Sequence, residues 1–317
     1  MRKFAKITAW KLDFQVKKMN WISIAIVGYA LLAVEAVMSK YILAARMKSW
    51  PIYAFYVGIF SFFGILFVPF GFKWFGFLPF LISFLSGIIF FLSLAFLFHA
   101  LIRSSVPRVY ILFGSVSTIA TTILASFLLG EIFSKKEMAG IFFLLLGGTV
   151  ISYKFYASRF FSHWRGATLA GILAAFSLIL LKLGYDNGTF VSGYVVSRMG
   201  ILFGALSALL IPDFRRSVFE NLKKRKRKEN VENLAGTIIA KSTAGLGTLL
   251  INYSISLGSV AIVSSLVSVQ YLLTFVFALF LSFFLKDIFI EKFSVLNFLT
   301  KMAGILLVTL GTMLLIF

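Results

Sequence analysis

The sequence has no cysteine, only two histidines and only 11 acidic residues in 317. Without cysteine the chain cannot form a disulfide, a thiolate metal site or a cysteine nucleophile. The two histidines, His99 and His163, are too far apart for the usual spacing of paired metal ligands. Charged residues make up 13% of the chain, against about 25% in soluble domains. The sequence thus has few of the residue types that form catalytic or metal sites, and no cofactor is predicted.

Apolar residues dominate instead: 60% of the chain is hydrophobic, 17% is aromatic, and the mean hydropathy is +0.99. Runs of about 20 apolar residues, the length that a helix needs to cross a bilayer, recur along the sequence. The connections between them are short and leave no room for a soluble domain. The predicted fold is an all-α integral membrane protein with ten transmembrane helices, at 20–41, 51–71, 78–101, 106–129, 137–154, 166–184, 189–211, 234–256, 259–285 and 294–317.

The net charge of +20 comes from lysines and arginines in the short connections and in a basic tail at 1–19. A nucleic-acid-binding protein would gather such residues on one folded soluble face, so no nucleic-acid partner is predicted. The first apolar run lacks the usual small-residue cleavage site, which favours a retained helix over a signal peptide. We therefore expect a multi-pass protein of the cell membrane whose partners are lipids and a small-molecule substrate.

An internal repeat organises these helices. The stretch Ala139-Gly140-IFFLLL-Gly147 returns as Ala303-Gly304-ILLVTL-Gly311 in the last apolar run of each half. The halves are 20–154 and 166–317, joined by a linker at 155–165, and the second contains a basic loop at 212–233. Because each half has five spans, an odd number, the second half must enter the membrane from the opposite face. Such inverted repeats are typical of secondary transporters, which bind substrate near mid-membrane between the halves.

Three motifs resemble the EamA-type repeats of the drug/metabolite transporter superfamily: LLGE at the end of helix four, KKEMAGIFFLLLGGTVIS after it, and GSVAIVSSLVSVQYLLTF in the second half. The resemblance covers about residues 20–317. It implies an exporter or importer of small metabolites, driven by exchange or by a coupling ion such as a proton or sodium. It also implies a central cavity among helices one to four and six to nine, with helices five and ten outside.

The charge distribution and the resemblance disagree about membrane orientation. Counted over alternate connections, ten basic residues lie on the N-terminal side and 19 on the other, many of them in KKRKRK at 223–228. The positive-inside rule then places both termini outside the cell. The superfamily usually has both termini inside. The basic run also suits anionic lipid headgroups, which gain about 1 kcal/mol for each nearby Lys or Arg.

Glu35 is the one acidic residue well inside a predicted span. A central charge costs about 2.5–3.5 kcal/mol on insertion scales, so such residues are functional candidates. A carboxylate there could take up and release a proton during transport, and Glu35 is our candidate for proton coupling. The alternative is a structural partner for a buried cation.

Two cations are further candidates. Arg198 lies near the centre of helix seven, where it either binds an anionic substrate or pins a helix to backbone carbonyls. Lys241 begins a face of helix eight that continues with Gly245, Thr248 and Asn252 at helical spacing. We expect this face to line the cavity, although polar residues of this kind also serve in contacts between helices.

Polar residues of helices four and nine occupy equivalent repeat positions. Ser264, Ser268 and Tyr271 form a face of helix nine, and Ser115 lies on helix four, so we expect them to face each other across the cavity. Glycines at 140, 147, 304 and 311, together with Gly200-ILF-Gly204, predict close packing with a neighbouring helix or subunit, in a monomer or a homodimer.

Two other functions remain open. A flippase for a lipid-linked sugar or phosphate would suit a cavity with excess positive charge, as Lys241 and Arg198 against one glutamate provide. An intramembrane enzyme needs paired carboxylates, a metal motif or a base beside a nucleophile, and this sequence offers none of these within its spans. The prediction is therefore a transporter rather than an enzyme.

Overall fold

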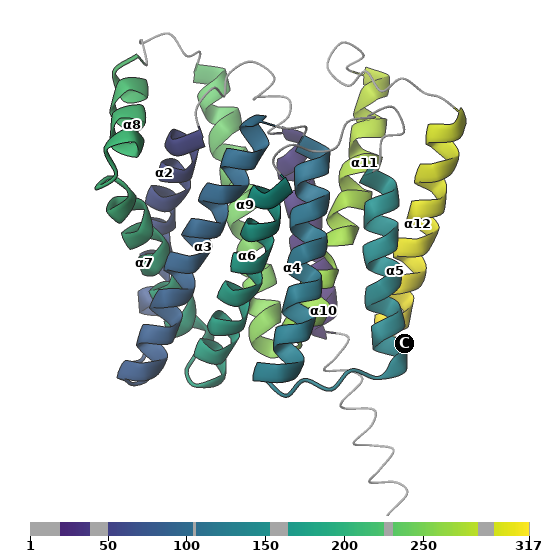
Figure 1. Cartoon of the computed structure of the whole chain (residues 1–317), viewed down its shortest axis with the longest axis horizontal. Coiled ribbons are helices and arrows are strands. Elements are labelled where there is room, and N and C mark those ends of the chain that lie inside the picture. The colour runs from purple at the N-terminus through teal and green to yellow at the C-terminus, as the bar shows by residue number, and fades with distance from the viewer. Residues whose placement is uncertain are drawn as a thin grey trace, which may run out of the picture.

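The structure is a computed structural model that describes residues 20–38, 50–103, 106–152, 164–224, 231–284 and 295–316. These residues fold into helices, with no β-strand among them (Figure 1). Seven stretches are long and apolar enough to cross a membrane by length and composition: Asn20–Met38, Trp50–Phe70, Phe77–Leu101, Trp164–Asp186, Phe190–Ala208, Val260–Leu281 and Leu299–Ile316. The chain is thus an all-helical protein of the multi-pass membrane type.

Helical segments lie in every predicted apolar run. After the first helix, Asn20–Met38, they are α2 (Trp50–Phe60), η1 (Ser61–Phe70), α3 (Phe77–Arg103), α4 (Val106–Leu128), α5 (Lys135–Ser152), α6 (Trp164–Asp186), α7 (Phe190–Ala208), α8 (Pro212–Lys224), α9 (Val231–Leu257), α10 (Val260–Ser265), α11 (Val267–Phe284) and α12 (Val295–Ile316). The tail at 1–19, most of the linker at 155–165, residues 225–228 of the basic run and the outer ends of several predicted spans lie outside the described residues.

Local signals explain where several helices begin and end. At the start of α5, the Ser134 side chain accepts from the Glu137 backbone N–H at 3.2 Å, and the Glu137 carboxylate accepts from the Ser134 N–H at 3.0 Å. This reciprocal pair is a capping box. Gly130, just after α4, has a φ of 66°, a backbone conformation that favours glycine.

Two predicted spans are not continuous α-helices. The second changes at Ser61 from α2 into the 3₁₀-helix η1, which contains Pro69. The ninth is broken at Leu266, between α10 and α11, where the Leu266 N–H reaches both the Ile262 and Val263 carbonyl oxygens. In membrane proteins, irregular backbone of this kind is found where it is buried in protein or lines a cavity.

The repeated glycines bring α5 and α12 together. A Cβ atom on Gly140 would lie 3.1 Å from the Gly311 carbonyl oxygen, and one on Gly147 would lie 2.8 Å from that of Gly304. The helices are antiparallel, since the earlier glycine of α5 meets the later glycine of α12. The predicted close packing is therefore present, and the neighbour is the corresponding helix of the other half. Gly200 of α7 similarly touches α3, where a Cβ atom would overlap the Phe84 carbonyl oxygen.

Two further helix pairs are in close contact. Between α3 and α6, the Ser86 hydroxyl donates to the Ser177 carbonyl oxygen and the Ser177 hydroxyl donates to that of Ser86, both at 2.9 Å. The first helix packs on α9, where Gly28 and Gly247 lie against each other's backbones. Ser254 of α9 also donates to the Trp21 carbonyl oxygen at 2.6 Å.

The predicted basic loop at 212–233 is wrong over its first half, because Pro212–Lys224 forms the helix α8. Phe214 and Val218, one turn apart, are buried against α2, and Arg216 forms an ion pair of 2.8 Å with Glu220 on the other side. Proline at the first position and Asp213 in the first turn also favour a helix here. The charge density of the segment concealed this amphipathic pattern.

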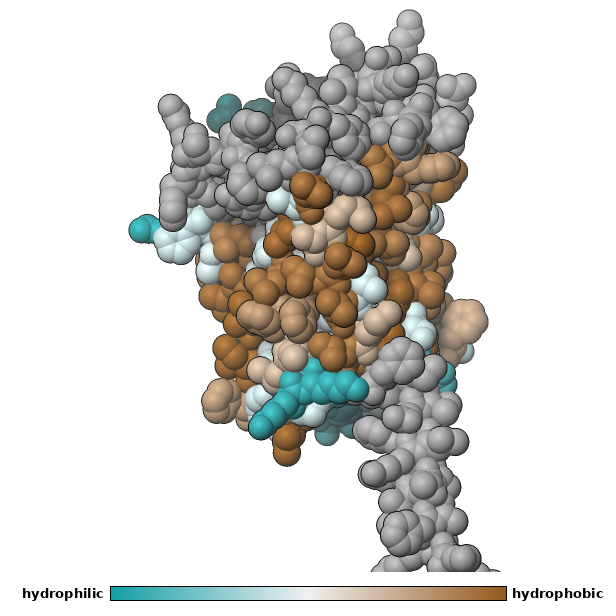
Figure 2. All heavy atoms as spheres, turned by 90° about the vertical axis from the view of Figure 1, so that its right-hand side faces the viewer, coloured by the Kyte–Doolittle hydropathy of each residue, from teal (hydrophilic) through white to brown (hydrophobic). Residues whose placement is uncertain are grey.

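The outer surface is apolar over a broad band. Figure 2 shows this band on the face that lies on the right-hand side of Figure 1, with hydrophilic residues at its lower margin. On α12 the exposed apolar side chains recur at helical spacing: Leu299, Met302, Leu306, Leu310 and Met313. A surface of this kind suits the hydrocarbon of a bilayer.

Candidate functional site

An ion pair joins the first helix to α9. The Lys241 ammonium group donates to the Glu35 carboxylate at 2.8 Å and to the Tyr53 hydroxyl of α2 at 2.9 Å, and it lies 5.2 Å from the centre of the Tyr53 ring. The Lys241 and Glu35 side chains are 29% and 17% exposed. Both were predicted as candidates, and the structure brings them together. Three helices are thus linked through one partly buried charge pair.

The predicted face of α9 continues from this ion pair past an open space. Gly245, one turn after Lys241, is exposed, and no atom of another described helix lies within 4 Å of the position that a Cβ atom would take there. Thr248, the next member of the face, is half-buried, and its hydroxyl donates to the Ala244 carbonyl oxygen of the same helix. The large exposed apolar residues of α9, among them Leu246 and Tyr253, lie on a different side of the helix. The space beside Gly245 therefore belongs to the polar side of α9.

Asn252 closes the other end of this face. It is buried, its amide group donates to the Thr248 carbonyl oxygen at 2.7 Å, and its oxygen lies 3.4 Å from the Tyr185 hydroxyl of α6. Tyr185 packs beside Phe190 of α7, with ring centres 5.5 Å apart. The face thus runs from a contact with the first helix and α2 to a contact with α6.

Arg198 lies on α7 against the 3₁₀-helix η1. Its guanidinium carbon is 4.5 Å from the centre of the Tyr194 ring, one turn earlier, and its Cβ and Cγ atoms cover Gly64. A Cβ atom on Gly64 would approach the Arg198 Cγ to 2.6 Å. The Nε atom is buried and has no hydrogen-bond partner among the described residues. This Nε atom therefore does not bind a backbone carbonyl group of the described residues, and both predicted roles of Arg198 stay predictions.

The other predicted residues occupy contacts near the break between α10 and α11. Ser264 and Ser268 are buried, and Ser264 donates to the Ala261 carbonyl oxygen of its own helix. Ser268 faces Gly148 of α5, and Tyr271 donates to the Tyr110 carbonyl oxygen of α4 at 3.0 Å. Ser115 of α4 is half-buried. Within the described structure, Ser268 and Tyr271 contact neighbouring helices and do not join the face of α9.

The carbonyl groups beside the break are bound by other helices. Tyr29 of the first helix donates to the Val263 carbonyl oxygen at 2.9 Å, and Thr118 of α4 donates to that of Ser264 at 3.3 Å. The break in the backbone is thus held from two sides by hydroxyl groups.

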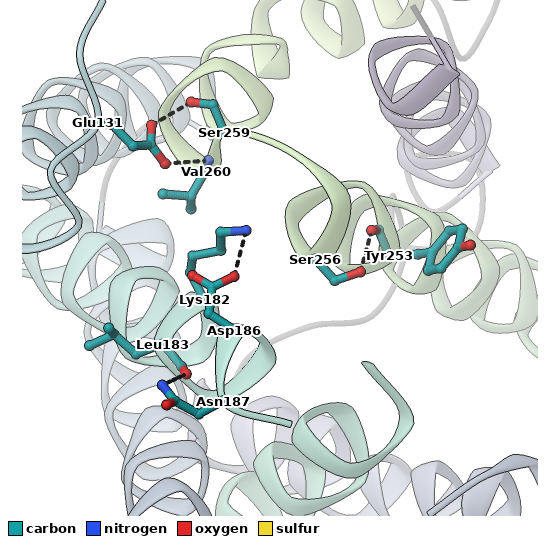
Figure 3. A network of polar contacts seen from close by, with 9 residues as sticks. All are labelled: Glu131, Lys182, Leu183, Asp186, Asn187, Tyr253, Ser256, Ser259 and Val260. Carbon is teal, nitrogen blue, oxygen red and sulfur yellow. Dashed lines mark hydrogen bonds and ion pairs between the residues drawn. The ribbon is translucent and has the colours of Figure 1, made fainter. Parts of the chain in front are cut away.

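A second polar network lies where α4 and α6 end and α10 begins (Figure 3). The Glu131 carboxylate accepts from the Ser259 hydroxyl at 2.6 Å and from the Val260 N–H at 3.2 Å, so it caps the N-terminus of α10. Nearby, Lys182 pairs with Asp186 at 2.9 Å, one turn apart on α6. Glu131 thus binds a distant helix start, whereas Asp186 binds a cation of its own helix.

The sequence did not reveal Tyr53 or Tyr185, which bind two of the predicted residues. Each is an aromatic residue among many, and its partner is more than 60 positions away, so no local spacing points to it. Among the described residues, no group of three or more His, Asp or Glu side chains lies close enough to hold a metal ion.

No family model and no curated protein matches the sequence. The fold is similar to that of a protein of known crystal structure, with a TM-score of 0.64 over 94% of this chain and 95% of the other. The two sequences are 13% identical over that match. At this identity the similarity establishes a shared fold and carries no information about activity.

Proposed function

We propose that this chain is a secondary transporter of a small organic metabolite, built as two inverted five-helix repeats of the EamA type in the drug/metabolite transporter superfamily. The observation that carries this proposal is the polar face of α9. It runs from the Glu35–Lys241 ion pair to Asn252 past an open space, in a chain of membrane-type helices. Polar and charged groups inside such helices are expensive, and they mark substrate and ion pathways.

Equivalent contacts support the inverted repeat. Gly28 meets Gly247 between the first helix and α9, and Ala170 meets Ser93 between α6 and α3. The first members of these pairs are 142 residues apart, and the second members are 154 apart. The same offsets carry Glu35 to Ser177 and Lys241 to within one residue of Ser86. The Glu35–Lys241 ion pair therefore corresponds to the Ser86–Ser177 contact, and each of the two contacts joins one half to the other.

The contact between α5 and α12 also joins residues that are equivalent in the two repeats. Gly140 and Gly147 are the repeat equivalents of Gly304 and Gly311, and each meets a glycine of the other helix. A twofold axis between two equivalent segments produces a contact of this kind, because each segment then presents the same residues to the other. An axis in the membrane plane, which inverted repeats require, also makes the two helices antiparallel.

The difference between the two equivalent contacts gives Glu35 its proposed role as the coupling acid. Ser86 and Ser177 are almost fully buried and carry no titratable group, whereas Glu35 and Lys241 are charged and partly exposed. Protonation of Glu35 would remove its charge and weaken its bond to Lys241, which would release the first helix from α9. Proton binding would thus favour opening at one side of the membrane only.

The test uses purified protein in sealed liposomes and a broad panel of labelled metabolites. Wild type should exchange at least one solute, and a proton gradient should drive its accumulation. Glu35→Gln should abolish the accumulation and leave exchange measurable. Ser86→Ala, at the equivalent neutral contact, is the matched control and should retain gradient dependence. Absence of exchange or gradient-driven flux for every solute would refute the transporter, and full accumulation by Glu35→Gln would limit Glu35 to a structural role.

A further inference from the structure

Arg198 differs from two other cations of the membrane-type helices, Lys241 and Lys182, each of which has an acidic partner. Lys241 pairs with Glu35, and Lys182 pairs with Asp186. No carboxylate among the described residues forms an ion pair with Arg198, although it is the ninth residue of the 19-residue helix α7. Among the described residues, this charge near the middle of a membrane-type helix therefore has no anionic partner.

An aromatic ring and a glycine hold the Arg198 side chain in place, and its buried Nε atom has no hydrogen-bond partner among the described residues. The Tyr194 ring that contacts the guanidinium also packs against Phe67 and Phe190, at 5.7 and 5.5 Å between ring centres. Stacking on a ring occupies the face of the guanidinium plane and leaves its N–H groups at the edge. The aliphatic part lies on Gly64, where a larger residue would displace it.

The position of Arg198 connects it with the polar face of α9. Phe190 and Tyr194 lie on the same side of α7, and Phe190 contacts Tyr185. Tyr185 in turn reaches Asn252, at one end of that face. A ligand beside α9 would thus lie on the side of α7 from which these aromatic rings extend.

We infer that Arg198 binds an oxyanion, a carboxylate or phosphate group of the transported molecule, through the free edge of its guanidinium. This inference rests on the proposed function and names its substrate class. The guanidinium fork matches the two oxygens of such a group, so one anion satisfies both the charge and the unused donors. The Glu35–Lys241 pair is neutral as a whole, and Arg198 supplies the surplus positive charge.

The binding test measures thermal unfolding of the purified protein in nanodiscs of zwitterionic lipid. The probes are sodium phosphate and sodium succinate, each compared with sodium chloride at the same ionic strength, and succinamide as an uncharged analogue. A ligand that binds only the folded state raises its Tm. We expect at least one oxyanion to raise the Tm by about 2–4 °C and succinamide to leave it unchanged.

Three variants separate the binding role from a structural one. Arg198→Gln should lose the anion response and keep or raise the ligand-free Tm, because it removes an unpaired charge. Arg198→Lys keeps the charge without the fork and should respond only partly. Gly64→Ala leaves Arg198 present but displaces it, and should weaken the response in the same direction. A second set of nanodiscs with phosphatidylglycerol tests whether a lipid phosphate supplies the oxyanion.

Several results would overturn the inference. They are an absence of any oxyanion response in wild type, a response that Arg198→Gln retains, or a marked fall in the ligand-free Tm of both Arg198 variants. If wild type transports only neutral or cationic solutes and Arg198→Gln transports them equally well, the transport proposal is supported and the oxyanion site is refuted. If the anion response depends on Arg198 but no solute crosses the liposome membrane, the anion-binding site is supported and the transport proposal is refuted.

Discussion

Replacing Lys241 by methionine tests how much the ion pair between the first helix and α9 contributes to stability. Methionine keeps most of the length of the side chain, so the main losses are the charge and the two hydrogen bonds to Glu35 and Tyr53. Breaking a fully buried pair costs about 3–5 kcal/mol, and an exposed pair contributes about 0.2–1 kcal/mol. With side chains 29% and 17% exposed, this pair lies between those limits, at roughly 1–2 kcal/mol.

A double-mutant cycle isolates the interaction from the other effects of each change. Lys241→Met and Glu35→Gln should each lower the Tm in detergent by about 2–5 °C, and the double variant should lose less than the sum of the two. Lys182→Met is the matched control, since its pair with Asp186 is local and the carboxylate is 45% exposed. It should cost only about 0.3–0.5 kcal/mol. Strictly additive effects of Lys241→Met and Glu35→Gln would show that the two side chains do not stabilise each other, and would refute the argument.

Two other predictions concern packing and orientation. Gly147→Leu would force α5 away from the Gly304 carbonyl oxygen, so it should lower the Tm by several degrees, whereas Gly245→Leu should leave the Tm unchanged because its side chain meets open space; equal losses in both variants would contradict the packing described. If Gly245 lines the transport path, the same leucine should also reduce solute flux in liposomes. Arg216→Cys introduces a single cysteine at a side chain that is 81% exposed, and an impermeant thiol reagent should label it only after permeabilisation if α8 is cytoplasmic. Labelling in intact cells would reverse the orientation favoured by the charge count.

The positions of the helices follow from the sequence because a membrane helix depends mainly on one local property, a run of about 20 apolar residues. α8 was missed because it is short and charged, and among its described side chains Phe214 and Val218 are the ones buried in the core. The breaks at Ser61 and Leu266 were also missed. A break of this kind does not change the hydropathy of the run. It depends on how side chains of neighbouring helices bind the backbone carbonyl groups beside it.

The candidate site was only partly predictable. Glu35 and Lys241 were selected separately, as charges that are costly inside a helix, but their contact spans 206 positions and no periodicity reveals it. The contact agrees with the alternative in which Glu35 is the partner of a buried cation, and coupling remains a proposal. Ser268 and Tyr271 share a face of one helix as expected, yet helical spacing cannot tell which neighbour that face meets. Here the neighbours include Gly148 and Tyr110.

The glycine contact between α5 and α12 has a consequence for how such a chain could arise. Each helix offers the other the same arrangement of two glycines, so neither needs a partner with a different surface. A five-helix protein with this helix at its end would already match an inverted copy of itself. Duplication and fusion would then join two subunits that could associate beforehand, and later substitutions such as Glu35 and Arg198 would make the two halves different.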